Sequence, residues 1–105
     1  MAYVYLIGQR DDLTKYKIGV TKGDVSKRLK KLQTGNAEEL YLVNSFETDA
    51  PFILETLLHK RYGHKKILNE WFLLDKKDVE DFYNVCVLLQ KGVDALKDNC
   101  FFKKH

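Results

Sequence analysis

Three side chains near the start of the chain have the chemistry and the spacing to handle a phosphate group. Two short runs of β-forming residues, 3–7 and 16–21, carry Tyr5 and Lys17, and Arg28 follows on a basic segment. Two paired strands place side chains next to one another, and the following helix can bring a guanidinium to the same sheet edge. The planar fork of donors on arginine matches phosphate oxygens. Nucleic-acid chemistry is therefore the first hypothesis.

Basic side chains form two groups in the sequence. The first lies beside Arg28 on the same predicted helix and consists of Lys27, Lys30 and Lys31. The second follows the next predicted helix and consists of Lys60, Arg61, Lys65 and Lys66. A basic helix face is most often simply solvated, and composition alone favours that alternative. Two basic groups that flank one carboxylate nevertheless resemble a groove that follows a phosphate backbone.

The carboxylate between the two basic groups is Glu55, and His59 follows it by four residues. Because helical positions three and four apart share a face, we expect Phe52, Glu55, His59 and Tyr62 to point the same way. One carboxylate, together with water molecules and phosphate oxygens, is enough to hold Mg²⁺. The alternative is a surface Glu–His pair that supports the helix, and such pairs are more common than metal sites.

Local sequence patterns place these residues on strands and helices. β-Forming residues predict strands or extended segments at 3–8, 16–21, 39–48 and 70–74. Apolar side chains at helical spacing predict helices at 25–33, 51–62 and 75–97. We expect an α/β (α+β) fold with a central antiparallel sheet of three to four strands, flanked by helices and followed by a long C-terminal helix. Residues 1–105 are expected to form one domain, with its core at about 1–75 and a helical extension at about 76–105.

Several residues mark where the predicted elements begin and end. Asp24 suits the N-cap of the first helix, and Pro51 suits the first turn of the second. Gly35 suits a left-handed position at the end of the first helix. The stretch 63–69 is expected to be a basic loop, and the apolar tail 100–102 is expected to fold back onto the core.

Composition narrows the function classes. The net charge of +3 permits an anionic partner without requiring one, and no apolar run is long enough to span a membrane. We expect a cytoplasmic protein, or a nuclear one in a eukaryotic or viral setting, with no membrane contact. Cys86 and Cys100 have no zinc-site spacing with the histidines. Cys86 is expected in the core, and a disulfide with Cys100 is the less favoured alternative.

Taken together, these motifs resemble the GIY-YIG nuclease superfamily, and most closely its small branch found in phages and viruses. Tyr3-Val4-Tyr5 occupies the place of the first motif, and Lys17-Ile18-Gly19 that of the second, with lysine where many members have tyrosine. The segment 28–36 resembles the helix and turn of that branch. Glu55 and His59 match its later helix, and 69–72 (Asn-Glu-Trp-Phe) matches its closing motif.

The resemblance implies hydrolysis of phosphodiester bonds in nucleic acid, with DNA as the expected substrate and one divalent metal, Mg²⁺ or Mn²⁺. Glu55 would bind the metal, Tyr5 would help to deprotonate the attacking water, and Arg28 would stabilise charge on the phosphate. Lys17 would take the place of the second tyrosine, and Asn69 would match a late asparagine. The residues expected to contact the nucleic acid are Lys27, Lys30, Lys31, His59, Lys60 and Asn69.

One departure from the family pattern concerns proton transfer. Many members have histidine or tyrosine one turn after the arginine, where this chain has Leu32. Lys31 or His59 is a candidate replacement. Two alternatives to the nuclease stay open: a nucleic-acid-binding module that has lost efficient cleavage, and a protein-interaction domain. In the latter, Val87 and Leu88 on the last helix would contact a second copy or another partner.

Overall fold

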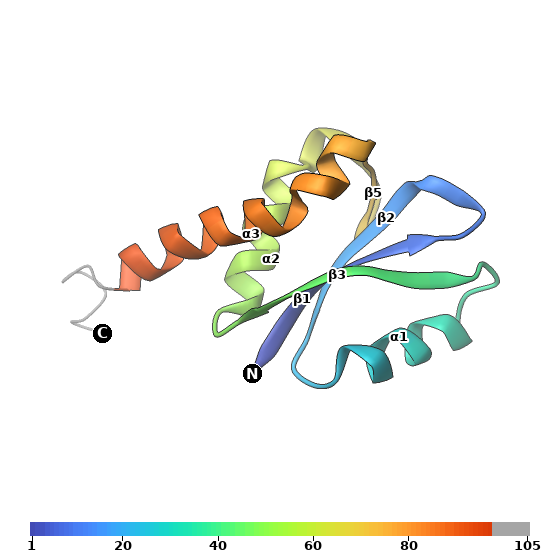
Figure 1. Ribbon diagram of the computed structural model, residues 1–105, viewed down its shortest axis with the longest axis horizontal. Coiled ribbons are helices and arrows are strands. Elements are labelled where there is room, and N and C mark those ends of the chain that lie inside the picture. Colours follow the sequence, from blue (N-terminus) through green and yellow to red (C-terminus); the bar gives the residue numbers. More distant parts are fainter. Residues whose placement is uncertain (98–105) are drawn as a thin grey trace.

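A five-stranded antiparallel sheet with the strand order β3-β1-β2-β5-β4 forms the centre of the protein (Figure 1). The computed structural model describes residues 1–97. Its strands are β1 (Ala2–Gln9), β2 (Asp12–Thr21), β3 (Leu40–Thr48), β4 (Lys66–Leu68) and β5 (Trp71–Leu73). The mixed fold with an antiparallel sheet is as expected from the sequence.

The number of strands exceeds the three to four that the sequence predicts. The stretch expected to be a basic loop forms a 3₁₀ turn, Gly63–Lys65, and then the short strand β4. All three residues of β4 are exposed, so the strand has none of the alternation between buried and exposed positions that reveals a strand in a sequence. Pairing with β5 creates this strand, and that pairing is invisible to local patterns.

The interior strand β1 pairs with β2 on one side and with β3 on the other. Both faces of β1 are covered, which explains its unbroken buried run from Val4 to Gly8. Because side chains alternate along a strand, Val4 and Leu6 enter one apolar cluster while Tyr5 and Ile7 enter another.

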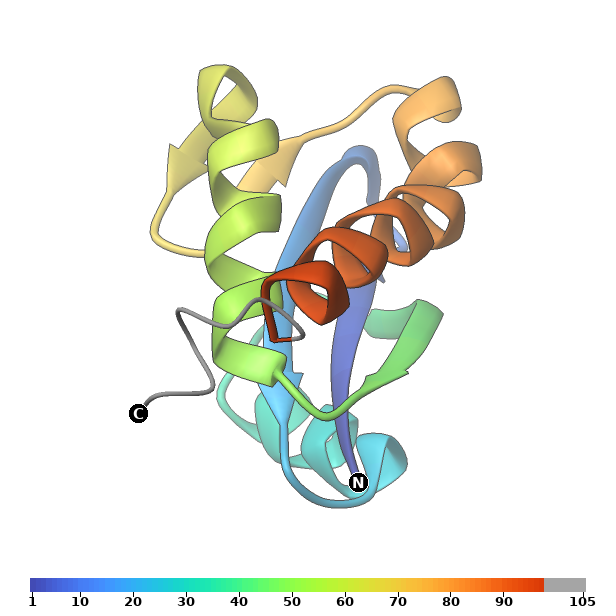
Figure 2. The same cartoon turned by 90° about the vertical axis from the view of Figure 1, so that its left-hand side faces the viewer.

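The three helices cover the two faces of the sheet unequally (Figures 1 and 2). Helix α1 (Val25–Thr34) packs on the face of Tyr5, whereas α2 (Pro51–Arg61) and α3 (Lys76–Lys97) lie together over the opposite face. The larger cluster lies under α2 and α3 and includes Leu54, Leu58 and Phe82, all fully buried. None of the described helices is both long enough and apolar enough to cross a membrane.

Two of the three predicted helix ends are confirmed. The side chain of Asp24 accepts a hydrogen bond from the Ser26 amide at 2.8 Å and caps α1, and Pro51 lies in the first turn of α2. Gly35 was expected in the left-handed conformation, and this expectation is wrong: its φ is −94°. The chain leaves α1 through ordinary turn geometry, in which the Gly35 amide donates to the Leu32 carbonyl at 3.3 Å.

Cys86 is buried in the cluster beneath α3, as its apolar surroundings predict, and burial raises the pKa of its thiol to about 12. The pairing of Cys86 with Cys100 and the folding back of the tail concern residues outside the described part of the chain, which ends at Lys97.

The open edge of β2 determines where a site can form. Strand β5 pairs with β2 only from Lys15 to Lys17, so the second half of β2 continues beyond its neighbour. The loop after β2 leads directly into α1, and α2 packs against β2 from the other face. Side chains from both helices can therefore meet at this edge.

Candidate functional site

The hydroxyl of Tyr5 faces Arg28, as the sequence predicts for a shared site. Tyr5 lies opposite Gly19 in the β1–β2 ladder, and its ring crosses the position where a Gly19 side chain would be. A Cβ atom added to Gly19 would lie 2.5 Å from the Tyr5 hydroxyl oxygen. Above this contact, Arg28 Nε donates a hydrogen bond to the Tyr5 hydroxyl at 3.4 Å. That contact is the main cause of a raised pKa for Arg28.

Tyr5 itself is screened from solvent. Its exposed fraction is 0%, and α1 packs over it through Val25, Leu29 and Leu32. The hydroxyl therefore contacts Arg28 rather than bulk water. Arg28 is only half-buried and can reach a ligand at the surface.

Lys17 forms an ion pair with Glu70, with 2.7 Å between the ammonium nitrogen and a carboxylate oxygen. The β2–β5 register creates this contact, because Lys17 lies opposite Trp71 and Glu70 directly precedes that residue. The ammonium also lies 5.7 Å from the centre of the Trp71 ring. The backbone adds to the arrangement, since the Ile18 amide donates to the Glu70 carbonyl at 3.1 Å.

Glu55 and His59 lie close to Glu70, and these three side chains form a carboxylate cluster. Glu55, His59 and Glu70 each offer one ligand atom, and these atoms all lie within 4.8 Å of one another. His59 Nε2 lies 3.0 Å from the Ile18 carbonyl oxygen. Because a carbonyl oxygen only accepts hydrogen bonds, Nε2 is the donor, and the lone pair of the neutral ring is on Nδ1.

The two carboxylates of the cluster titrate differently. Burial, followed by the neighbouring Glu70 carboxylate, raises the pKa of Glu55 to about 7. Burial also acts to raise the pKa of Glu70, but the hydrogen bond and charge of Lys17 outweigh it, so that the pKa of Glu70 is lowered. Near neutral pH, Glu70 is thus ionised while Glu55 carries a proton in part of the molecules.

The donor atoms of this cluster fit a divalent cation. Two carboxylates supply hard oxygen ligands that suit Mg²⁺ and Mn²⁺. His59 Nε2, which lies 4.0 Å from Glu55, is committed to the Ile18 carbonyl and leaves the carboxylates as the ligands. Lys17 already places one positive charge on Glu70, so a bound cation would compete with this ammonium.

Comparison with known families bears directly on this site. The profile of the T5orf172 domain family matches residues 2–87. The chain belongs to the T5orf172 domain family. The match extends from β1 into α3 and includes every residue of the cluster. No curated protein and no solved structure gives a significant match to the chain.

The basic residues of this T5orf172 domain are divided by the fold. Lys27, Arg28 and Lys31 line an open hollow of about 260 Å³ together with Thr21, Gly23 and Asp24. Lys30 is exposed on the same helix, and Lys60 is exposed on α2, but neither lines this hollow. Of the predicted nucleic-acid contacts, the structure thus brings Lys27 and Lys31 to the hollow beside Arg28.

Asn69 and Glu70 lie next to each other but differ in their surroundings. Asn69 is exposed, and its φ of 55° places it in the left-handed conformation that asparagine tolerates, at the turn between β4 and β5. Glu70 is the residue whose side chain reaches Lys17 and Glu55. Sequence reasoning missed Glu70 as a site residue, although the segment 69–72, which was compared with the closing motif of GIY-YIG nucleases, contains it.

Leu32 occupies the position at which a proton-transferring residue was considered. It packs against the cluster of Tyr5, Ile7 and Leu40. Leu32 is therefore part of the apolar layer between α1 and the sheet. Of the two candidate replacements, His59 lies in the carboxylate cluster, whereas Lys31 lies in the basic hollow that it lines with Lys27 and Arg28.

Proposed function

We propose that this T5orf172 domain is a metal-dependent endonuclease that hydrolyses phosphodiester bonds in nucleic acid, with DNA as the substrate. The observation that carries the proposal is that six polar groups lie in two sets along β2, the Tyr5–Arg28 pair and the cluster around Glu70, whose charge also acts on Arg28. They are Tyr5, Lys17, Arg28, Glu55, His59 and Glu70. Cations and carboxylates arranged in this way suit the transfer of a phosphoryl group, which needs positive charge where negative charge develops.

The order of these residues along the chain supports the same function. Tyr5, Lys17, Arg28 and Glu55 follow one another as the functional residues of GIY-YIG nucleases do. In this proposal, Glu55 and Glu70 hold Mg²⁺ or Mn²⁺, with His59 beside them. When bound, the cation supplies Lewis-acid polarisation of the phosphate.

Arg28 is the group that we assign to the phosphate. Its guanidinium is half-buried, lines the basic hollow and can pair with two phosphate oxygens. Tyr5 holds Arg28 through the 3.4 Å hydrogen bond. We propose that Tyr5 acts as a phenolate: its hydroxyl first gives its proton to solvent, Arg28 Nε stabilises the resulting anion, and this anion then takes the proton of the attacking water. Because the hydroxyl is screened, this step requires that α1 opens over Tyr5 when the substrate binds.

Lys17 balances the charge of the carboxylates. Its ammonium pairs with Glu70 and keeps that group ionised, which is the form that binds a cation. This is a different task from that of the tyrosine which many GIY-YIG nucleases have at this place. The substitution of lysine is therefore compatible with a metal site built from two carboxylates.

A second candidate function is a nucleic-acid-binding module that no longer cuts efficiently. It is favoured by Leu32, which lies in the apolar layer and cannot transfer a proton, and by the burial of Tyr5. The basic hollow of Lys27, Arg28 and Lys31 would serve such a module equally well.

Cleavage of supercoiled plasmid with Mg²⁺ or Mn²⁺ tests the proposal. Wild type is compared with Glu55→Gln and with the control Glu80→Gln, which removes an exposed carboxylate on α3. We expect nicking by wild type and Glu80→Gln, and loss of nicking in Glu55→Gln. No cutting by any of the three, combined with salt-sensitive binding of DNA, would replace the nuclease with the binding module.

A further inference from the structure

An exposed aromatic ring lies one helical turn from the carboxylate cluster. Phe52 is 56% exposed, in the first turn of α2, three residues before Glu55. Helical positions three apart share a face, so the ring and the carboxylate lie along the same side of α2. Its neighbour Ile53 is also 55% exposed, but Ile53 lines the apolar groove between α2 and α3 with Leu57 and Leu88. Phe52 therefore belongs to the site side of the helix.

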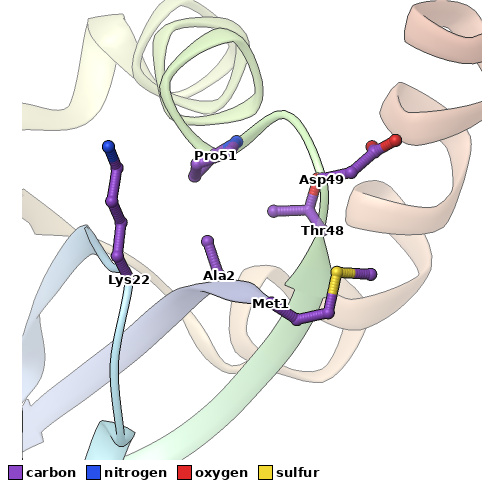
Figure 3. A pocket seen from close by; sticks show the side chains of 6 residues that line it. All are labelled: Met1, Ala2, Lys22, Thr48, Asp49 and Pro51. Atoms are coloured by element: carbon purple, nitrogen blue, oxygen red, sulfur yellow. The ribbon is translucent and has the colours of Figure 1, made fainter.

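A cation accompanies this ring. Lys22 directly follows β2, and its ammonium nitrogen lies 5.4 Å from the centre of the Phe52 ring. Lys22 also borders a hollow of about 400 Å³ at the start of α2, where its side chain extends alongside Pro51 (Figure 3). The ring and its cation are thus open to solvent rather than covered by the protein.

The loop from Thr21 to Asp24 joins two surfaces of different chemistry. On the side of α1 it borders the hollow of Lys27, Arg28 and Lys31. On the side of α2 it carries Lys22 next to Phe52. Proteins that bind single-stranded nucleic acid combine basic side chains along the phosphate backbone with aromatic rings on which bases stack.

We propose that Phe52 is a stacking platform for an unpaired base, and that Lys22 contacts the phosphate of the same nucleotide. The inference rests on the proposed function for its ligand, nucleic acid, and adds the substrate class. A base inside a duplex has both faces stacked on its neighbours and offers none to Phe52. The preferred substrate is therefore a strand with at least one unpaired nucleotide beside the phosphate that Arg28 holds.

Binding in EDTA tests this proposal, because the proposed metal-dependent cleavage cannot take place without the metal. The probes are a fluorescently labelled single-stranded oligonucleotide and a blunt duplex of the same sequence. Wild type is compared with Phe52→Ala and with the matched control Ile53→Ala, an equally exposed residue on the other side of α2. Thermal melting verifies that each variant is folded.

We expect wild type to bind the single strand more tightly than the duplex. Phe52→Ala should bind the single strand about fivefold or more weakly, because the contact with one stacked base is lost. Its affinity for the duplex, and both affinities of Ile53→Ala, should equal those of wild type. In Phe52→Trp, affinity should be retained, and single-stranded probe should quench the added indole emission relative to wild type, which has Trp71 alone.

Three outcomes would overturn the proposal. They are equal losses for single strand and duplex in Phe52→Ala, an equal loss in Ile53→Ala, and the absence of nucleic-acid binding by wild type. Failure of the nuclease proposal is separate, because it appears in the plasmid assay with metal. A protein that binds single strands through Phe52 but never cuts would keep this inference and lose the catalytic one.

Discussion

The Lys17 ammonium lies 2.7 Å from the Glu70 carboxylate and joins β2 to the residue that precedes β5. The Lys17 side chain is only 13% exposed, so this ion pair is better shielded from solvent than an ordinary surface pair. Because Glu70 also neighbours Glu55, the pair sets the charge available to a divalent cation. Four predictions concern this edge of the sheet.

Removal of the Lys17 charge should increase stabilisation by Mn²⁺. The measurement is made at pH 8, where a carboxylate is ionised without the help of Lys17. In Lys17→Met the two carboxylates then have no competing ammonium, so the added ion should raise the melting temperature more than it does for wild type. The matched control is Lys15→Met, because Lys15 is exposed on the same strand and pairs with Asp12 instead. Identical Mn²⁺ shifts in Lys17→Met and wild type would show that Lys17 does not compete for this site.

The contribution of Glu55 to the free energy of unfolding should decrease as the pH rises from 4.5 to about 7. Its folded-state pKa, about 7, lies above the usual 4.5, so the folded protein binds this proton more tightly than the unfolded chain does. The resulting stabilisation is complete below pH 4.5 and is lost as the pH rises through 7. Glu55→Gln should therefore gain stability relative to wild type at pH 8 but not at pH 4. Urea unfolding at both pH values measures the difference, and parallel behaviour of the two proteins would contradict it.

Gly19→Ala should disturb the contact between Tyr5 and Arg28. Its added Cβ atom would lie 2.5 Å from the Tyr5 hydroxyl, and the buried ring has little room to move. We expect a loss of about 1–3 kcal/mol in the free energy of unfolding, as for other overpacked sites. Gly23→Ala is the control, since nothing lies within 4 Å of an added Cβ there. Chemical denaturation compares them, and equal stability of both variants would argue against the steric role of Gly19.

Tyr5→Phe should separate chemistry from packing. The variant keeps the buried ring but removes the hydroxyl that binds Arg28, so we expect cleavage to slow about 100-fold, the lower range for loss of a proton-transfer group. Tyr3→Phe is the control, because the Tyr3 hydroxyl donates to Glu47 at the surface, away from Arg28. Rates of plasmid nicking give the comparison. A Tyr5→Phe variant as fast as wild type would remove Tyr5 from the proposed chemistry.

Much of this protein was predictable from local sequence. The spacing of Val25, Leu29 and Leu32 determines a helix that presents Arg28 toward the sheet, and the Asp24 cap determines where that helix begins. The i, i+4 spacing of Glu55 and His59 likewise places both in the candidate metal cluster. Such features depend on residues within one or two turns, so the sequence alone determines them.

Tertiary structure decided which residues complete the site. Glu70 joins the cluster because β5 pairs with β2 in a register that brings it to Lys17, 53 residues away in the chain. The same kind of pairing places Tyr5 over Gly19 and creates β4 from residues with no strand pattern. Strand register follows from the packing of the whole sheet, since a one-residue shift would turn every side chain to the opposite face. The sequence thus determined the helices, most strands and the first members of the site, whereas long-range pairing decided how Glu70, Lys17 and Gly19 meet them.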